Sequence, residues 1–296
     1  MRPNYRPSEM KVIVLIDNNP DPEGKYLTEH GISIYFEADG LKWLFDVGAS
    51  PDFGINARRM GIDIAAVDYL ILSHAHRDHT GGLEYFLRKN KKARVVMAPL
   101  SSGQLIVSYR KQIHHDITID HSIIAKFRDR FDFAERDLNL SANVTLIRKI
   151  STNSQLPKAN CLLFQTDGEV ERPDDFRHEI TLTVRTSEGI VLFSGCSHHG
   201  ILNILMTAST IFNDETIVAT IGGTHLLDSD WYSEFETEGE ITEMANTIVA
   251  KYPAMKLITG HCTGNQAQQL FSRILTNRFG LFHSGATYHF GENQGH

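Results

Sequence analysis

The sequence predicts an α/β protein in which two β-sheets pack face to face and helices cover both outer faces, a four-layer αββα sandwich. Short apolar or alternating runs of strand length occur in both halves of the chain, which indicates two sheets. In each half, the first strands are joined by hairpin-like connections and the later strands by helical segments. Because residues 1–296 contain neither a low-complexity linker nor an internal repeat, we expect one domain.

The first half of the chain supplies the elements of one sheet. Strands are predicted at residues 12–16, 32–36, 41–47, 69–72 and 94–97, and helices at residues 55–60 and 81–89. The strand at residues 12–16 ends in a turn rich in Asp, Asn and Pro. Asp39 and Gly40 are typical of a tight hairpin turn, so the strands on either side of them are expected to pair.

The second half of the chain is also rich in predicted strands. These strands lie at residues 144–147, 161–165, 181–186, 190–193, 217–221 and 256–258, and helices are predicted at residues 201–212, 241–252 and 265–279. Between the halves, residues 100–140 have mixed polarity and helix-like spacing of Ile123, Ile124, Phe127 and Phe131. We therefore expect an inserted helical segment at about residues 100–140, which caps a site, pairs subunits or lies on the surface.

The composition excludes several classes of protein. With 41% hydrophobic and 22% charged residues, the chain is not collagen-like, disordered or a coiled coil. Its formal net charge of −7 disfavours nucleic acid as a partner, since proteins that bind polyanions are usually basic. Three Cys residues cannot form a disulfide framework and fit a reducing compartment. No segment approaches the roughly 20 apolar residues of a membrane-spanning helix, so we expect a cytoplasmic protein without a membrane partner.

The chain has 15 His residues, and three of them lie in one short motif. Residues 73–82 read Ser-His-Ala-His-Arg-Asp-His-Thr-Gly-Gly, directly after a predicted apolar strand and before a predicted helix. Imidazole and carboxylate groups are ligands of Zn²⁺, Fe and Mn. His74 and His76 can reach one ion, and Asp78 and His79 can reach a second. The motif therefore predicts a metal site at the carboxyl end of a strand.

The motif His-x-His-x-Asp-His after an apolar strand resembles that of the metallo-β-lactamase superfamily, whose αββα members mostly bind two metal ions. Residues 44–48 (Leu-Phe-Asp-Val-Gly), 191–195 (Val-Leu-Phe-Ser-Gly) and 259–261 (Thr-Gly-His) resemble further parts of the same superfamily. Residues 29–31, 195–198, 222–226 and 260–264 are similar to the branch that includes 7,8-dihydropterin-6-methyl-4-(β-D-ribofuranosyl)aminobenzene-5′-phosphate synthase. The resemblance extends along nearly the whole chain and implies the metallo-β-lactamase fold.

The resemblance also implies metal-binding roles. It places His74 and His76 in metal site 1, and Asp78, His79 and His261 in metal site 2. Where the superfamily usually has a bridging Asp, this chain has Cys196, and His198 follows two residues later. A thiolate is a good ligand for Zn²⁺ or Fe. Either Cys196 or His198 is expected to take the ligand role, and the sequence leaves these alternatives equal.

A second departure from the superfamily pattern concerns the third His of metal site 1. It is expected near residues 96–99, where no His stands. His114 and His115 in the insert are candidate substitutes without a spacing signal, and His198 is another. Site 1 is therefore expected to be weak, rebuilt with His198 or empty, and a single metal ion is one of the alternatives.

Several polar residues outside the motif receive expected roles. His225 follows two Gly residues, which allow a close backbone approach to a ligand, and we expect it to bind substrate or act as a general acid. His30 is a substrate-binding candidate through the resemblance, with capping of a loop as the alternative. Asp46 is expected to orient a ligand His, and Cys262 to point away from the metals. The remaining predictions are surface or structural roles for His121, His178, His199, His283, His289 and His296.

These features predict a metal-dependent hydrolase in which a metal-activated water attacks an ester, amide or phosphoester of a small molecule. Asp78 is expected to act as ligand and base, and His225 to assist the leaving group. Zn²⁺ is the expected metal, as one or two ions, with Fe and Mn as alternatives. The resemblance implies a phosphate-bearing substrate, and a homo-oligomer is compatible with the sequence.

Two other functions follow from the same residues. The branch implies a transferase that condenses a dihydropterin pyrophosphate with a ribosyl-aminobenzene phosphate, with the metals holding the pyrophosphate. The missing third His, and the presence of Cys196 where the superfamily usually has a bridging Asp, favour instead a metal-binding module that has lost catalysis. We give this last alternative the least weight, because His74, His76, Asp78, His79 and His261 are all present.

Overall fold

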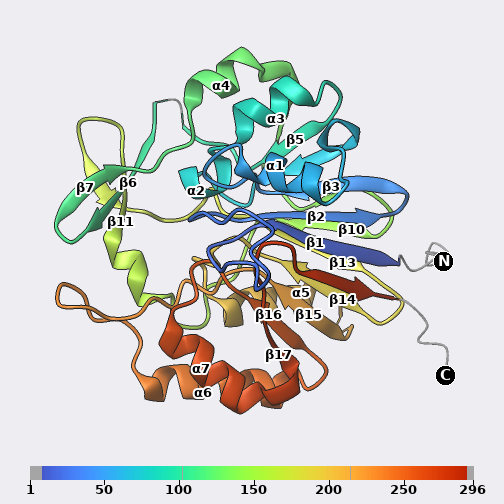
Figure 1. The fold of residues 1–296 in the computed structure, drawn as a ribbon. Coiled ribbons are helices and arrows are strands. Elements are labelled where there is room, and N and C mark those ends of the chain that lie inside the picture. Colours follow the sequence, from blue (N-terminus) through green and yellow to red (C-terminus); the bar gives the residue numbers. More distant parts are fainter. Residues whose placement is uncertain (1–8, 102, 214, 292–296) are drawn as a thin grey trace.

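The computed structural model describes residues 9–101, 103–213 and 215–291, and it has the predicted αββα architecture (Figure 1). Two seven-stranded sheets lie face to face in the middle of the molecule. One layer of helices covers the first sheet, comprising α1 (Asp52–Arg59), α2 (Arg77–Thr80), α3 (Leu83–Lys89) and α4 (His121–Lys126). The other layer covers the second sheet, comprising α5 (Ile201–Ile211), α6 (Glu238–Lys251) and α7 (Asn265–Leu275). The predicted surface role of His296 lies outside the described residues.

The first sheet has the strand order β18-β1-β2-β3-β4-β5-β8. Its strands are β1 (Met10–Ile16), β2 (Ser33–Ala38), β3 (Leu41–Phe45), β4 (Tyr69–Ile71), β5 (Arg94–Met97), β8 (Phe131–Phe133) and β18 (Thr287–Phe290). The strands from β3 to β8 pair in parallel, whereas the other pairs are antiparallel. The predicted hairpin forms, with φ of 55° at Asp39 and 72° at Gly40, as a two-residue turn of this kind requires.

The second sheet has the strand order β17-β16-β15-β14-β13-β10-β9. Its strands are β9 (Leu138–Asn139), β10 (Val144–Ile147), β13 (Thr181–Arg185), β14 (Ile190–Phe193), β15 (Ile217–Ile221), β16 (Lys256–Thr259) and β17 (Phe279–Leu281). The strands β14 to β17 are parallel. The helix predicted at residues 265–279 is too long: it ends at Leu275, because Thr276 has a left-handed backbone conformation (φ 54°), and β17 follows.

Apolar layers on both faces of each sheet hold the sandwich together. Between the sheets, the rings of Phe36 and Phe193 stack with their centroids 4.8 Å apart. On the outer faces, helices bury side chains such as Phe86 of α3 and Phe271 of α7 completely. Full burial of one such ring stabilises a fold by roughly 1.5–3 kcal/mol. Because both faces are covered, strands such as β1 are apolar along nearly their whole length.

The prediction of a helical insert at about residues 100–140 is wrong, because strands take up more of this segment than helices do. Strands β6 (Leu105–Arg110) and β7 (Ile113–Asp116) form a sheet with β11 (Leu163–Thr166) and β12 (Glu171–Pro173) in the order β12-β11-β6-β7, and we call it the third sheet. The turn between β6 and β7 consists of Lys111 and Gln112 with φ of 52° and 63°, and it lacks the Gly or Asn that normally signals such a turn. The helical spacing at Ile123 and Ile124 corresponds only to the six-residue α4.

The ends of several strands meet at one edge of the sandwich. In the first sheet, the carboxyl ends of β1, β3 and β4 lie there, and in the second sheet those of β14, β15 and β16. Ligands of α/β proteins commonly bind outside the carboxyl ends of parallel strands, so this edge positions the candidate site. Among the described residues, no helix has both the length and the apolar character needed to cross a membrane.

Candidate metal centre

The loop after β4 carries most of the predicted metal ligands. The loop is short, and α2 begins at Arg77, so His74, His76, Asp78 and His79 lie on less than two turns of chain. The rings of His74 and His79 are fully buried, with centroids 4.0 Å apart. Close contact between buried imidazoles in a loop of this kind is costly unless the ring nitrogens are satisfied.

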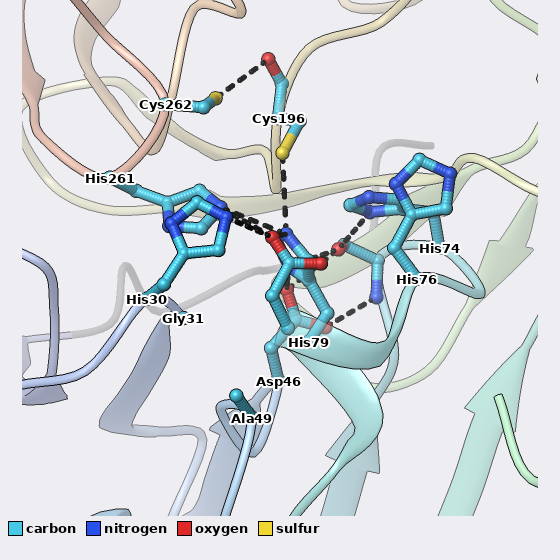
Figure 2. A network of polar contacts seen from close by, with 12 residues as sticks. His30, Gly31, Asp46, Ala49, His74, His76, His79, Cys196, His261 and Cys262 are labelled. Atoms are coloured by element: carbon cyan, nitrogen blue, oxygen red, sulfur yellow. Dashed lines mark hydrogen bonds and ion pairs between the residues drawn. The ribbon is translucent and has the colours of Figure 1, made fainter. Parts of the chain in front are cut away.

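A first cluster, which we call the four-residue group, consists of Asp78, His79, Cys196 and His261. Figure 2 labels three of its members, His79, Cys196 and His261. One ligand atom of each residue lies within 4.8 Å of the others. The Nε2 atom of His79 is 3.1 Å from Nε2 of His261 and 3.3 Å from Sγ of Cys196. The carboxylate of Asp78 is 3.3 Å from Nε2 of His261. The structure therefore brings together the residues predicted for metal site 2 and adds Cys196 to them.

The outer nitrogens of this group are held by side chains around it. The Nδ1–H of His79 donates to Oδ2 of Asp46 at 2.7 Å, which is the orienting role predicted for Asp46. Asp46 is itself fixed by the backbone N–H and the hydroxyl of Ser73, at 2.7 and 2.6 Å. On the other side, Nδ1 of His261 contacts the Asn18 side-chain oxygen at 3.1 Å. Because both Nδ1 atoms are donors, the Nε2 atoms keep their lone pairs for the interior of the group.

A second cluster, the three-histidine group, consists of His74, His76 and His198. Nε2 of His198 is 3.4 Å from Nε2 of His74. Their outer nitrogens contact the Ser73 hydroxyl at 2.9 Å and the Asn160 side-chain oxygen at 3.1 Å, respectively. His198 thus lies where the third His of metal site 1 was expected.

The other candidates for that third position do not reach the cluster. His114 and His115 are exposed on β7, and His114 lies 3.9 Å from Glu171. Cys196 and His198, which the sequence left as alternatives for one ligand position, lie in different clusters: Cys196 in the four-residue group and His198 in the three-histidine group. The absence of a His near residues 96–99 therefore no longer favours an empty site.

Sequence reasoning missed the buried contact between Asp174 and His178. Nδ1 of His178 accepts the backbone N–H of Ala75 at 3.2 Å, so its Nε2–H donates to Asp174, 2.9 Å away. Asp174 also lies near the ring of His76, whose Nε2 is 4.0 Å from the carboxylate and has no hydrogen-bond partner. His178 is therefore structural, as predicted, but it lies beside the site. Its four-residue spacing from Asp174 was the only signal in the sequence.

The remaining histidines lie outside the two groups. His199 contacts Glu179 at 2.6 Å, and the same carboxylate accepts the backbone N–H of His198 at 2.7 Å. The others are partly buried or exposed side chains away from the clusters: His121, which contacts the Gln104 carbonyl; His283, which contacts the Ser284 carbonyl; and His289 on β18.

A pocket of about 450 Å³ opens onto both groups and is lined by residues from each of the three sheets. His225 lies in its wall, 4% exposed, and neither ring nitrogen has a hydrogen-bond partner. His30 lies at its rim, where its ring stacks on that of His261 and its Nε2 is 3.4 Å from Asp78. Both residues predicted to bind substrate therefore line one cavity.

The expectation for Cys262 is wrong, because this residue also lines the pocket. Strand alternation does not apply to it, since β16 ends at Thr259 and His261 has a left-handed backbone conformation (φ 48°) that redirects the chain. Asp46 and His225 share this conformation, with φ of 59° and 51°. Non-Gly residues in such conformations cost about 1–3 kcal/mol each and are typical of functional sites.

The electrostatics of the site favour cation binding. Burial, reinforced by the neighbouring imidazoles, lowers the pKa of His74 and His198 well below 6.5, so both rings are neutral. Burial alone would raise the pKa of Asp78, but His79 and His261 outweigh it and lower the pKa well below 3.8. Burial likewise opposes the charge on His261, yet Asp78 and Cys262 raise its pKa to about 9. The negative field that holds this proton also attracts a metal cation.

These residues fit bound metal ions. Four imidazoles have their outer nitrogens occupied as donors, and their Nε2 atoms face each other in pairs at 3.1 and 3.4 Å. Facing lone pairs are unfavourable unless a proton or a cation lies between them. The mixed nitrogen, oxygen and sulfur donors of the four-residue group suit Zn²⁺ or Fe, and the imidazoles of the other group suit the same metals.

Comparisons with known proteins agree with this geometry. A family model described as the metallo-beta-lactamase superfamily matches residues 28–102, which include the loop after β4. The chain is 26% identical to 7,8-dihydropterin-6-methyl-4-(beta-D-ribofuranosyl)-aminobenzene-5'-phosphate synthase of Methanocaldococcus jannaschii over 93% of this chain and 95% of that protein.

Solved structures of proteins with this fold are also similar to the chain. Tm1679, described as a metal-dependent hydrolase of the beta-lactamase superfamily, is 28% identical with a TM-score of 0.78, over 96% of this chain and all of that chain. The metallo-beta-lactamase fold protein YhfI of Bacillus subtilis is 12% identical with a TM-score of 0.58, over 96% of this chain and 100% of that chain, and supports the fold alone.

Proposed function

We propose that the chain is a metal-dependent hydrolase of the metallo-β-lactamase superfamily that cleaves an ester or phosphoester bond in a small anionic molecule. One observation carries this proposal. The Nε2 atoms of His79 and His261, and those of His74 and His198, face each other across two adjoining clusters beside a pocket. A metal cation at each pair satisfies the facing nitrogens, and the pocket gives a substrate access to it.

We assign one ion to the four-residue group and one to the three-histidine group, with Zn²⁺ as the first choice and Fe or Mn as alternatives. When bound, such ions supply a water nucleophile at neutral pH and stabilise negative charge on a substrate oxygen. Asp46, Asn18 and Asn160 keep the ligand imidazoles in place through their outer nitrogens.

The protein's own groups handle the protons and the substrate. Asp78 is ionised because of the imidazoles around it, so its carboxylate can accept a proton from the attacking water. His225 lines the pocket with unpartnered nitrogens, and it can hydrogen-bond the substrate and assist the leaving group. His30 at the rim, whose Nδ1 contacts the Asn18 side-chain amide at 3.0 Å, is positioned to bind the substrate.

The third sheet supports the assignment of an anionic, phosphate-bearing substrate. One face of this sheet brings Ser108, Arg110 and His115 to the pocket wall opposite the clusters. No described carboxylate lies within ion-pair distance of the Arg110 guanidinium, which is close enough to His30 to oppose protonation of that ring. A guanidinium without a carboxylate partner is well suited to a phosphate or carboxylate group.

The wall is fixed relative to the metal clusters. The backbone N–H of Arg77 donates to Ile117, and that of Ile119 donates to Ala75, at 2.7 and 2.8 Å. We therefore expect Arg110→Gln to raise KM for an anionic ester by about tenfold, with little change in kcat. Arg172→Gln, on β12 beside Asp167, is the matched control, and equal effects of the two variants would contradict the assignment.

The hydrolase proposal is tested with nitrophenyl esters of a carboxylic acid, a phosphate monoester and a phosphate diester, assayed with added Zn²⁺, Mn²⁺ or Fe²⁺. We expect turnover that a chelator abolishes and metal restores, and that His76→Ala loses. If the purified protein contains no metal and no ion raises its activity, the proposal is wrong.

A transferase is the second candidate, favoured by the similarity to the Methanocaldococcus jannaschii synthase along almost the whole chain. Such an enzyme would join a dihydropterin pyrophosphate to a ribosyl-aminobenzene phosphate, and the metals would hold the departing pyrophosphate. Incubation with both compounds distinguishes the candidates. Pyrophosphate release that depends on the acceptor supports the transferase, and hydrolysis without the acceptor supports the hydrolase.

A further inference from the structure

Three buried side chains that have no common role so far meet at the ends of β14, β15 and β16. They are Cys196, His225 and Cys262, which are 3%, 4% and 6% exposed. One ligand atom of each lies within 4.8 Å of the others. All three line the pocket of about 450 Å³, so the cluster has access to solvent and to small molecules.

The His225 ring is the first sign that a ligand belongs here. Both of its nitrogens are buried, and neither has a hydrogen-bond partner. An unsatisfied buried polar group is unfavourable, and such groups in native structures commonly mark an ion or ligand site. The neighbouring ring of His198, with its centroid 4.2 Å away, makes no hydrogen bond to either nitrogen.

The backbone around the two sulfurs is built for close approach. The N–H of His225 donates to Sγ of Cys262 at 3.3 Å, a contact that stabilises a thiolate. A Cβ atom at Gly223 would lie 2.4 Å from the same sulfur, so only Gly leaves room for it. Ser197, which follows Cys196, has a left-handed backbone conformation (φ 61°), as His225 does. Two loops thus adopt unfavourable conformations that turn these side chains toward one another.

We propose that Cys196, Cys262 and His225 form an additional binding position for a thiophilic divalent ion, with Zn²⁺ as the natural occupant. Two thiolates and one imidazole, with a fourth position open to the pocket, are a known donor set for zinc. In a tetrahedral site with Zn–S bonds of about 2.3 Å, the two sulfurs lie about 3.8 Å apart, which the cluster accommodates. Each thiol releases its proton to solvent when the ion binds.

This position goes beyond the proposed reaction and does not depend on it. Cys196 also belongs to the four-residue group, so its sulfur lies between the two positions. One nitrogen of His225 binds the ion, and the other remains a hydrogen-bond donor for the substrate. The position also gives Cys262 a role that the two predicted metal sites leave without explanation.

Cadmium-113 NMR of the full-length protein, loaded with ¹¹³Cd²⁺ under reducing conditions, tests the proposal because each bound ion gives its own signal and each thiolate shifts that signal downfield. We expect one signal in the range of two-thiolate sites. In Cys262→Ser it moves to the range of one-thiolate sites, and in the control Cys161→Ser, which removes the exposed thiol, it stays in place.

The spectrum of the unmodified protein decides the matter even if a variant fails to fold. If no signal lies in the two-thiolate range, Cys262 is not a ligand and the proposal is overturned. A Cys196–Cys262 disulfide found by peptide mass spectrometry in the reduced, cadmium-loaded protein would overturn it as well. An absence of hydrolytic activity leaves the spectrum unaffected, so failure of the proposed function is distinguishable from failure of this proposal.

Discussion

The two sheets contribute to the metal centre in different ways. The first sheet places His74, His76, Asp78 and His79 on a single loop after β4. The second sheet supplies its residues one or two at a time, from separate loops after β14, β15 and β16. The loop of the first sheet is therefore one local unit, whereas the contribution of the second sheet exists only when its parallel strands are correctly packed.

This difference extends to the supporting contacts. Asp46, which orients His79, directly follows β3, the strand next to β4 in the same sheet. By contrast, Asn160, which contacts His198, lies in a 3₁₀ helix (Lys158–Leu162) outside the second sheet, and Asn18, which contacts His261, follows β1 of the opposite sheet. We infer that changes in the first sheet affect the whole centre, and that changes around the second sheet affect one ligand at a time.

The largest effect is expected for His79→Ala. Its Nε2 lies within 3.1–3.7 Å of the ligand atoms of the three other members of the four-residue group. Its loss should remove one bound ion and lower kcat/KM by about 10² or more, since the ion provides nucleophile and charge stabilisation. Metal content by mass spectrometry and hydrolysis rates measure this. His114→Ala, an exposed residue on β7, is the control, and full metal content in His79→Ala would contradict the assignment.

Asp46→Asn is expected to have the next largest effect, because it removes the charged acceptor of the His79 N–H. Loss of such a supporting group typically weakens metal binding 10–100-fold. Competition with a fluorescent chelator measures the affinity. Asp68→Asn, which breaks an exposed ion pair with Lys92 near the other end of β4, should leave the affinity unchanged. Similar losses in both variants would mean that Asp46 acts only through stability.

Asn160→Ala addresses the second sheet directly. The Asn160 side chain contacts Nδ1 of His198 at 3.1 Å and donates to the His198 carbonyl at 2.8 Å. The ring also stacks on Phe176 with centroids 4.4 Å apart, so part of its support remains. We expect about a tenfold loss of affinity for one ion and no change for the other. Equal weakening of both ions in a metal titration would show that the two groups respond as one unit.

The smallest effect is expected at Asp39, which links the sheets away from the metal centre. Its carboxylate accepts hydrogen bonds from Ser141 and from the backbone and side chain of Asn143. Asn tolerates the left-handed conformation of Asp39, so Asp39→Asn tests the carboxylate alone. We expect the free energy of unfolding at neutral pH to fall by about 0.5–1 kcal/mol, with metal content unchanged.

The pH dependence of this variant provides its own check. Burial would raise the pKa of Asp39, but the hydrogen bonds from Ser141 and Asn143 outweigh it and lower the pKa below 3.8. The carboxylate therefore contributes stability above pH 3.8, and this contribution is lost as the pH falls through the lowered pKa. The difference between the two proteins in urea unfolding should shrink in acid. If the difference in the free energy of unfolding stays constant as the pH falls well below 3.8, this account is contradicted.

The fold and half of the centre are predictable from sequence because their signals are local. The apolar run at residues 12–16, the hairpin at Asp39 and the His-rich loop each combine residues that lie next to one another in the chain. The third sheet was missed because its turn at Lys111 and Gln112 contains no residue typical of that turn. Sequence alone predicts such a turn poorly when the surrounding tertiary structure imposes it.

Contacts between distant segments could not be predicted in the same way. Only Ser197 separates Cys196 from His198, yet the two join different clusters, and Ser197 has a left-handed backbone conformation. The predicted orientation of Cys262 was wrong for a related reason, since β16 ends before this residue. Asp174 is 98 residues from His76 in sequence numbering, and only the folded chain places them 4.0 Å apart.

The third sheet is tied to the loop after β4 by backbone hydrogen bonds of Arg77 and Ile119. Side-chain substitutions on β6 and β7 leave these bonds in place, because the bonds involve only peptide groups. The pocket wall formed by β6 and β7 can therefore change residue by residue while the loop after β4 keeps its geometry. In evolutionary terms, relatives with this arrangement can diverge in what they bind without rebuilding the reactive centre, and engineering of selectivity should begin at Ser108, Arg110 and His115.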